Sequence, residues 1–267
     1  MQVSIKRVEP QSKITLQESA GLAIITINRP HLRNALTSRM WDELTHLGKR
    51  ILDNPKNRVV IIRGNGPHFT AGSDIKEFSQ MTLEEAEEAF VRMEKAISTF
   101  ERLPLPTIGV VNGPAMGAGF VFALACDLRI GSNNTQMGIP VGRLGITLND
   151  KFVKRIVDLI GPSRAKDLVY TGRLFNAEEC YQLGLINYLV ETERLDRFAF
   201  ELGKKISSQS PASVYAVKRS VASSIPGINV PWGDPRQVFV DPYDFPEGIR
   251  AFVEKRSPQF KDRRGQH

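Results

Sequence analysis

Residues 109–127 read Gly-Val-Val-Asn-Gly-Pro-Ala-Met-Gly-Ala-Gly-Phe-Val-Phe-Ala-Leu-Ala-Cys-Asp, and this stretch decides the fold. Small and β-branched residues at 107–111 predict a buried strand, and apolar residues at 120–125 predict a helix. The glycine-rich turn between them, at a helix N-terminus, leaves backbone N–H groups unpaired in front of the helix dipole. Such a turn stabilises a phosphate or a developing oxyanion. The glycines also fit a simpler role, which is to let the strand and the helix pack closely.

The composition is that of an ordinary globular protein. The 267 residues are 41% hydrophobic and 24% charged, which fits one large domain or one domain with a helical appendage. Lys and Arg outnumber Asp and Glu by 36 to 29, giving a net charge of +7 that favours anionic small molecules. The basic residues form no array with aromatic residues, so we do not expect nucleic-acid binding.

Cysteine and histidine usage does not predict a metal site. Cys126 and Cys180 fall on buried or helical positions without ligand spacing, which is typical of inert, reduced thiols. The histidines form no ligand pair at helical spacing (His31, His46, His68 and His267). The first residues lack the apolar core of a signal peptide, and no apolar run approaches the ~20 residues that cross a bilayer. We therefore expect a cytoplasmic protein that does not enter membranes.

Strands and helices alternate along most of the chain. Strand patterns occur at 14–17, 22–28, 59–63, 107–111, 128–130 and 185–190, and the break at 19–21 between the first two predicts a hairpin. Helical patterns occur at 37–51, 84–102, 120–125, 149–160 and 163–169, in a short helix capped by Asn176, and at 195–207, 212–223 and 246–256. Thr37 or Ser38 is the expected cap of the first helix, and Gly161-Pro162 is an expected break. Residues 136–145 and 225–235 read as loops. The order predicts an α/β core followed by a helical tail.

Four motifs stand in a fixed order along the chain. They read Ile-Asn-Arg-Pro-His-Leu-Arg-Asn-Ala-Leu at 27–36, Phe-Thr-Ala-Gly-Ser-Asp-Ile-Lys at 69–76, Asn-Gly-Pro-Ala-Met-Gly-Ala-Gly at 112–119 with Ala-Cys-Asp at 125–127, and Gly-Ile-Arg-Ala-Phe-Val-Glu-Lys-Arg at 248–256 with Phe-Lys-Asp at 260–262. Together they resemble the crotonase (enoyl-CoA hydratase/isomerase) superfamily, and the resemblance covers residues 12–262.

The resemblance implies an architecture. We expect a crotonase-like ββα spiral core of the α/β class over residues 1–195, with two nearly perpendicular sheets. A C-terminal helical trimerisation region is expected over residues 196–267. The resemblance also implies self-association as a homotrimer or a dimer of trimers.

The resemblance further implies an acyl-CoA thioester substrate and no permanently bound cofactor, metal or nicotinamide, with coenzyme A arriving as part of the substrate. By position, the backbone N–H groups of Ser73 and Ala118 form the family's oxyanion hole. The implied coenzyme A contacts are Leu32, Arg33, Ala71, Ile75 and Lys76, with Phe252 and Lys255 from an adjacent subunit. The cationic members suit an anionic nucleotide, and they also fit a plain solvated surface.

The chain departs from the family at two positions. The family's hydratases use a pair of glutamates to activate water and to protonate the α-carbon. Those positions hold Val121 and Val141 here, and valine cannot transfer a proton. Ordinary hydration by that pair is therefore not expected, and both side chains are assigned to the acyl pocket.

Three other residues are candidates for the catalytic or substrate-binding roles that the two valines cannot perform. Asn149 stands where some relatives, including dienoyl-CoA isomerases and chlorobenzoyl-CoA dehalogenases, carry a catalytic aspartate, and Asp150 follows it. Asp150 would act as a general base or nucleophile, but the pair also fits an N-cap and a first-turn acid of a helix. Arg143 either faces an acyl carboxylate in the pocket or pairs with a surface acid.

Two functions from different classes remain. The first is a crotonase-type lyase or isomerase that stabilises an enolate or oxyanion and performs isomerisation, decarboxylation, hydrolysis or an atypical hydration. The second is a catalytically silent member that binds coenzyme A or serves as a scaffold. Turnover of any CoA thioester separates the two.

Overall fold

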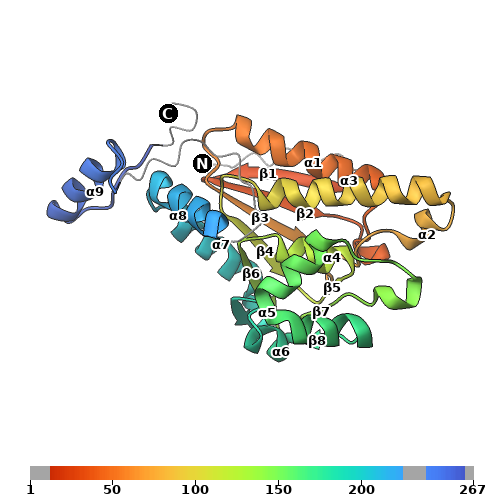
Figure 1. Cartoon of the computed structure of the whole chain (residues 1–267). Coiled ribbons are helices and arrows are strands. Elements are labelled where there is room, and N and C mark those ends of the chain that lie inside the picture. The colour runs from red at the N-terminus through yellow and green to blue at the C-terminus, as the bar shows by residue number, and fades with distance from the viewer. Residues whose placement is uncertain (1–12, 225–238, 262–267) are drawn as a thin grey trace.

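The structure, a computed structural model, describes residues 13–224 and 239–261 (Figure 1). The described strands lie in two sheets, one of six strands and one of three, and the elements described after the last strand are all helical. This is the predicted α/β core with a helical C-terminal part. The loop predicted at 225–235 lies outside the described residues.

The larger sheet has the strand order β1-β2-β3-β4-β6-β9. Its strands are β1 (Ile14–Ser19), β2 (Leu22–Ile27), β3 (Val59–Gly64), β4 (Thr107–Val111), β6 (Leu128–Ser132) and β9 (Tyr188–Val190). β1 and β2 form the predicted antiparallel hairpin, and the other neighbouring strands run parallel. Ala20 and Gly21 join the hairpin with positive φ angles, as a two-residue turn requires.

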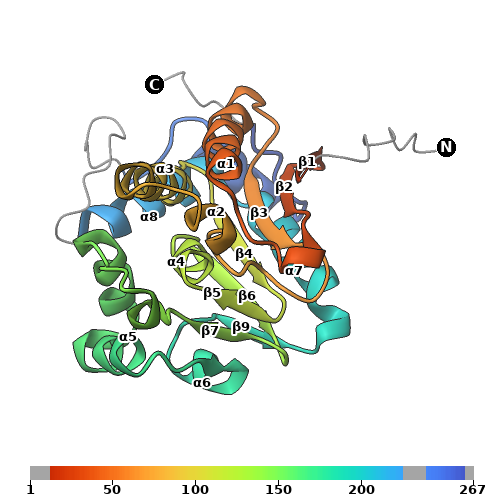
Figure 2. The same ribbon diagram turned by 90° about the vertical axis from the view of Figure 1, so that its right-hand side faces the viewer.

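Helices cover both faces of the middle of this sheet, so β2, β3 and β4 are largely apolar without alternation. In β3, Val60 and Ile62 join the larger core with residues of two helices, and Val59 and Ile61 join a second core with residues of a third. The first two helices are α1 (Ser38–Arg50) and α3 (Leu83–Glu101), and the third is α7 (Leu195–Ser207) (Figure 2). The sheet is thereby buried between α1 and α3 on one side and α7 on the other.

The smaller sheet corrects the sequence analysis. It contains β5 (Pro114–Met116), β7 (Gln136–Gly138) and β8 (Phe175–Asn176). The loop expected at 136–145 was wrong, because it holds β7 and a 3-10 turn at Val141–Leu144. Helix α4 (Ala118–Leu124) also starts two residues before its expected start. Strands this short carry too little pattern to be recognised, and only their distant partners define them.

Local signals placed the remaining helices well. The other helices are α2 (Ile75–Phe78), α5 (Asp150–Thr171), α6 (Ala177–Gln182), α8 (Pro211–Ser224) and α9 (Asp244–Val253). Thr37 caps α1 and Asn176 caps α6, as predicted. The predicted break inside α5 is confirmed at Gly161, which has a φ of 77°. The last helix runs from 244 to 253 rather than from 246 to 256.

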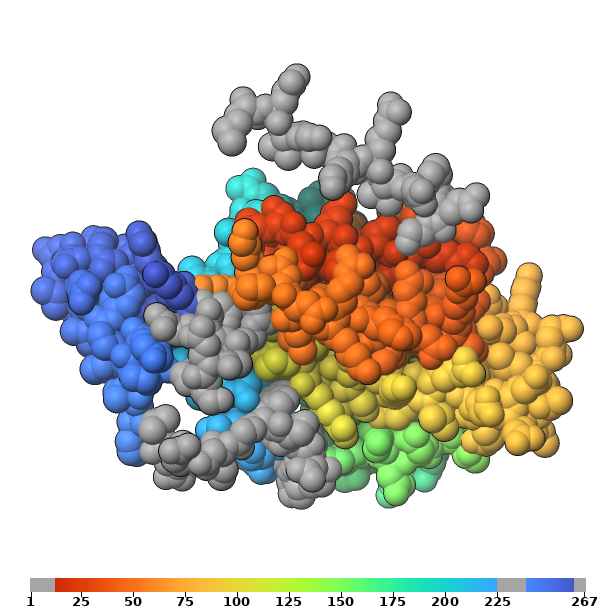
Figure 3. Space-filling model, turned by 90° about the horizontal axis from the view of Figure 1, so that it is seen from above, coloured from red at the N-terminus to blue at the C-terminus, as the bar shows by residue number. Residues whose placement is uncertain are grey.

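The C-terminal helices differ in how they meet the core. Leu195 and Ala199 of α7 are buried against the larger sheet, whereas the described side chains of α8 include no buried one. Helix α9 projects from the body of the molecule (Figures 1 and 3). Its apolar side chains lie exposed on the single chain (Phe245, Ile249, Phe252 and Val253). The division at residue 195 stays a prediction.

Candidate active site

Two turns that stand far apart in the sequence lie side by side in the fold. The first turn comprises residues 69–73, and the second, glycine-rich turn comprises residues 112–119. The Phe69 N–H donates to the Pro114 carbonyl at 3.1 Å, and the Met116 N–H donates to the Thr70 carbonyl at 3.1 Å. These bonds extend the small sheet by the segment that leads to Ser73. The backbones of the two turns are therefore held together by hydrogen bonds.

Glycine is required where the turns meet. Gly72 has a φ of +88°, and a Cβ there would lie 2.6 Å from the Met116 carbonyl oxygen and 2.9 Å from the Ala118 nitrogen. A Cβ on Gly119 would lie 2.5 Å from the Thr70 carbonyl oxygen. These two glycines thus allow close packing between the two turns, where any side chain would push them apart, whereas the packing expected from the sequence was between the strand and the helix.

The backbone N–H groups of Ser73 and Ala118 lie at this junction and are unpaired among the described residues, as are those of Gly119 and Phe120 in the first turn of α4. Of the adjacent groups, the Asp74 N–H donates to the Leu36 carbonyl at 2.9 Å and the Gly117 N–H donates to the Gly138 carbonyl at 2.9 Å. Ala118 is the first residue of α4, where the backbone lacks an intrahelical acceptor. Ser73 and Ala118 are both partly exposed, so a ligand oxygen can reach them.

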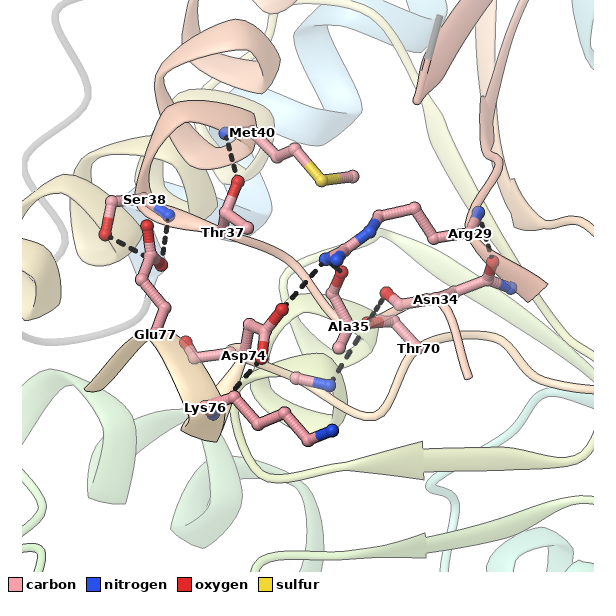
Figure 4. Close-up of polar contacts among 12 residues, drawn as sticks. Arg29, Asn34, Ala35, Thr37, Ser38, Met40, Thr70, Asp74, Lys76 and Glu77 are labelled. Carbon is pink, nitrogen blue, oxygen red and sulfur yellow. Dashed lines mark hydrogen bonds and ion pairs between the residues drawn. The ribbon is translucent and has the colours of Figure 1, made fainter. Parts of the chain in front are cut away.

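Asp74 begins α2 and is held in place by Arg29 (Figure 4). Its Oδ1 accepts from the Lys76 N–H at 3.2 Å, and its Oδ2 lies 3.1 Å from Arg29 Nη1. The same arginine nitrogen donates to the Ala35 carbonyl at 2.7 Å. Because Arg29 is buried, this ion pair ties the first turn to the loop that follows β2.

Asn34 also holds the loop that follows β2 in place. It is fully buried with a φ of 56°, and its Oδ1 accepts from the Arg29 N–H at 2.9 Å. Its Nδ2 donates to the Asn65 and His68 carbonyls at 2.9 and 2.7 Å. The Thr70 hydroxyl donates to its carbonyl at 2.7 Å. The side chain and backbone of Asn34 thus join the loop after β2 to residues 65–70.

The predicted coenzyme A contacts of the N-terminal half are brought together. The Ala71 N–H donates to the Arg33 carbonyl at 2.9 Å, so these two segments are neighbours. The same two segments also carry Leu32, which precedes Arg33, and Ile75 and Lys76, which come after Ala71. The side chains of these three residues and of Arg33 are exposed. They offer two cations and two apolar side chains beside the first turn.

Phe252 and Lys255 are not brought to this place within one chain. Phe252 lies on α9 and Lys255 just after it, at the end of the molecule opposite α2 (Figure 1). Their assignment to the site therefore requires a second copy of the chain, as the prediction states.

The two valines belong to the hydrophobic core. Val121 is 0% exposed on α4, and Val141 is 8% exposed where the 3-10 turn begins. Both side chains belong to one core cluster. Arg143, two residues after Val141, is exposed to solvent. Positions 121 and 141 therefore hold buried apolar side chains, and their neighbours in the cluster are apolar as well.

Asn149 acts as the N-cap of α5. Its Oδ1 accepts from the Phe152 N–H at 3.0 Å, which confirms the helix-capping interpretation of this residue. Asp150 follows as the first residue of α5, with an exposed side chain near the positive end of the helix dipole. Its carboxylate is free to meet a ligand from solvent.

His68 precedes the first turn, and burial together with the charge of Arg33 lowers its pKa. Burial raises the pKa of Cys126 and of Cys180 to about 12, so both thiols are unreactive, as predicted.

Within the described ranges, no group of three or more His, Cys, Asp or Glu side chains is placed to hold a metal ion. None of the helices described there is long and apolar enough to cross a membrane.

The sequence profile of the enoyl-CoA hydratase/isomerase family matches residues 17–263. The chain belongs to this family. An enoyl-CoA isomerase/hydratase of Mycosarcoma maydis is 30% identical over 267 residues, covering 95% of this chain and 96% of that protein. A short-chain-enoyl-CoA hydratase of Clostridium acetobutylicum is 32% identical over 258 residues, covering 94% and 99%. The crystal structure of an enoyl-CoA hydratase/carnithine racemase from Magnetospirillum magneticum matches with a TM-score of 0.87 at 29% identity, covering 95% and 97%.

Membership in the enoyl-CoA hydratase/isomerase family confirms the predicted crotonase fold. Sequence analysis missed three residues that contact the candidate site: Arg29, Asn34 and Trp41, whose indole N–H donates to the Ser73 Oγ at 3.3 Å. Arg29 and Asn34 stand inside a motif that was quoted for the resemblance, so their types were a usable signal. Trp41 gave no signal, because a tryptophan on an amphipathic helix reads simply as core.

Proposed function

We propose that this chain binds an acyl-CoA thioester and holds its carbonyl oxygen between the backbone N–H groups of Ser73 and Ala118. The observation that carries the proposal is that both groups lack an acceptor among the described residues and lie on turns that touch at Gly72. Two such donors stabilise the negative charge of an enolate or a tetrahedral oxyanion. Loss of one typically costs ~2.7–4 kcal/mol of transition-state stabilisation.

The proposed reaction does not use the two glutamates of the family's hydratases. Val121 and Val141 stand at those positions by resemblance, and neither can move a proton. The similar proteins named above are an isomerase/hydratase and a hydratase. For this chain, double-bond isomerisation, decarboxylation, hydrolysis and an atypical hydration are the reactions that fit an oxyanion hole in apolar surroundings.

Asp150 is the proposed general base or nucleophile. Its carboxylate is exposed, and it follows the capping residue Asn149 at the start of α5. Asn149 contributes by fixing that helix start, with its own oxygen already engaged. Arg143 is proposed to face an acyl carboxylate where the substrate is a dicarboxylyl-CoA, since its guanidinium is exposed on the loop before α5.

Coenzyme A is proposed to lie along Leu32, Arg33, Ala71, Ile75 and Lys76. The phosphates suit the two cations, and the adenine suits the exposed apolar side chains. Phe252 and Lys255 of an adjacent subunit complete this surface. The exposed apolar face of α9 supports self-association as a trimer or a dimer of trimers, because such a face gains stability when another chain covers it.

A second candidate is a silent member that binds CoA thioesters without converting them. It is favoured by the same two valines, which leave both usual acid/base positions empty of a carboxylate. The oxyanion site and the coenzyme A surface would then serve for binding alone.

The test is a panel of crotonyl-, dienoyl-, 3-enoyl-, malonyl- and hydroxyacyl-CoA, each incubated with the protein and followed by the mass of the acyl group. A gain of water, loss of CO₂, release of free CoA or a shifted double bond (seen by ultraviolet absorbance) identifies the reaction. Binding of the panel without conversion supports the silent candidate. Failure to bind any thioester overturns the proposed function.

A further inference from the structure

The side chain of Ser73 is attached to two core helices. Its Oγ accepts a hydrogen bond from Trp41 Nε1 at 3.3 Å and donates to Met93 Sδ at 3.4 Å. Trp41 lies on α1 and Met93 on α3, and each is 1% exposed. The first turn is therefore held from inside the core as well as by its backbone bonds.

Trp41 also contacts the helix that carries the second donor. Its ring packs edge-on against Phe122 of α4, with the ring centroids 5.8 Å apart and the planes at 76°. Phe122 is one turn after Ala118, the first residue of α4. A single side chain thus contacts both the Ser73 turn and the helix that begins with Ala118.

The backbone already restrains both peptide groups that flank Ser73. The Leu36 N–H donates to the Gly72 carbonyl at 2.8 Å and the Asp74 N–H donates to the Leu36 carbonyl at 2.9 Å. Because a trans peptide group is planar, the bond to the Gly72 carbonyl also directs the Ser73 N–H away from Leu36. The hydrogen bond from the Trp41 indole to the Ser73 side chain adds a restraint from the core, and a buried indole N–H retains its acceptor strongly.

We propose that Trp41 is a positioning residue, whose indole N–H holds Ser73 so that the Ser73 backbone N–H faces the substrate oxygen. Its ring, packed on Phe122, keeps that N–H at a set separation from the Ala118 N–H. The proposal rests on the proposed oxyanion site. Trp41 touches no substrate and acts through Ser73, and this distinguishes it from the donors themselves.

The test uses Trp41→Phe, which keeps an aromatic ring and removes the N–H, and Ser73→Ala, which removes the acceptor. Crotonyl-CoA labelled with ¹³C at the thioester carbon is the probe, and the C=O stretching frequency of the bound thioester is measured. Hydrogen bonds to the oxygen lower this frequency relative to free crotonyl-CoA. Thr45→Val is the matched control, because it removes a buried hydrogen bond to the Trp41 carbonyl on the same helix without touching Ser73.

We expect a lowered frequency in the wild type and in Thr45→Val, and a return part of the way toward the free value in Trp41→Phe and Ser73→Ala. Ser73→Thr keeps a hydroxyl and should restore the lowered frequency. For any thioester that the protein converts, kcat should fall at least about tenfold with KM little changed, against the ~10²–10³ typical of losing a donor outright. The double variant should be no worse than either single variant.

The outcomes separate the two proposals. A lowered frequency in the wild type that stays unchanged in Trp41→Phe and Ser73→Ala overturns the role of Trp41 and leaves the oxyanion site standing. An unshifted frequency of the bound thioester in the wild type overturns both, and where crotonyl-CoA does not bind, the same measurement is made with a thioester of the panel that does. If Trp41→Phe does not fold, Ser73→Ala and Ser73→Thr decide the question.

Discussion

Gly72 faces the backbone nitrogen of Ala118 so closely that a Cβ on Gly72 would lie 2.9 Å from it. The two residues lie on separate turns, and the proposed oxyanion site depends on the contact between these turns. Because the obstacle is backbone on both sides, neither turn can yield by rotating a side chain. The junction is thus a sensitive place to test the site.

Gly72→Ala should lower the free energy of unfolding by at least about 1–3 kcal/mol, since alanine is strained at a φ of +88° and its Cβ overlaps the opposite backbone. Urea unfolding measures this. Gly142→Ala is the matched control, because a Cβ there meets nothing within 4 Å. A loss no larger in Gly72→Ala than in Gly142→Ala would show that the turns do not touch in solution.

Ala118→Pro should remove one oxyanion donor and leave α4 in place, because proline is accommodated at the first position of a helix. Turnover of the thioester identified above should fall by about 10²–10³ in kcat. Leu83→Pro makes the same change at the exposed first position of α3 and should leave turnover unchanged. Equal turnover in the two variants would remove Ala118 from the site.

Asp150→Asn should lower kcat by about 10²–10⁴ if its carboxylate moves a proton in the reaction. Steady-state kinetics on the identified thioester measure the change. Asp158→Asn is the control on the same helix, where Asp158 pairs with Lys154 at 2.9 Å on the exposed side. Unchanged turnover in Asp150→Asn would dispose of this residue as base or nucleophile without affecting the oxyanion site.

Helix α5, which presents Asp150, is held to α3 by a buried ion network. Arg155 donates to both carboxylate oxygens of Glu94 at 2.9 Å and to both of Glu101 at 2.8 Å. Burial raises the pKa of Glu94, but hydrogen bonds from Arg155 and Ser98 lower it more, so the pKa lies below the usual 4.5. Glu94 therefore contributes stability above pH 4.5, which is lost as the pH falls through its folded-state pKa.

Glu94→Gln should accordingly lower the free energy of unfolding near neutral pH by up to about 3–5 kcal/mol, since it removes one partner of a buried charge. The difference from the wild type should shrink as the pH falls from about 6 to about 3. Urea unfolding across this range measures it. Glu201→Gln breaks the exposed pair with Arg197 and should change nothing. A difference that stays constant with pH would contradict the assignment.

Much of the fold could be predicted because its signals are local. The helix cap at Thr37, the break at Gly161 and the hairpin around Gly21 each depend on residues within a few positions. The motifs at 27–36 and 69–76 likewise placed the first turn and the loop beside it. Local signals did not predict β5 and β7. Each has three residues, and they are recognised as strands because they pair with each other.

The sequence by itself determined the alternation of strands and helices, the family, and the absence of glutamates at positions 121 and 141. Only the tertiary structure decided that the Ser73 and Ala118 turns touch, that Trp41 reaches Ser73, and that Arg155 lies between two acids of α3. The physical reason is distance along the chain. Helix and strand patterns record the environment of neighbouring residues, whereas these contacts join segments that meet only once the core has packed.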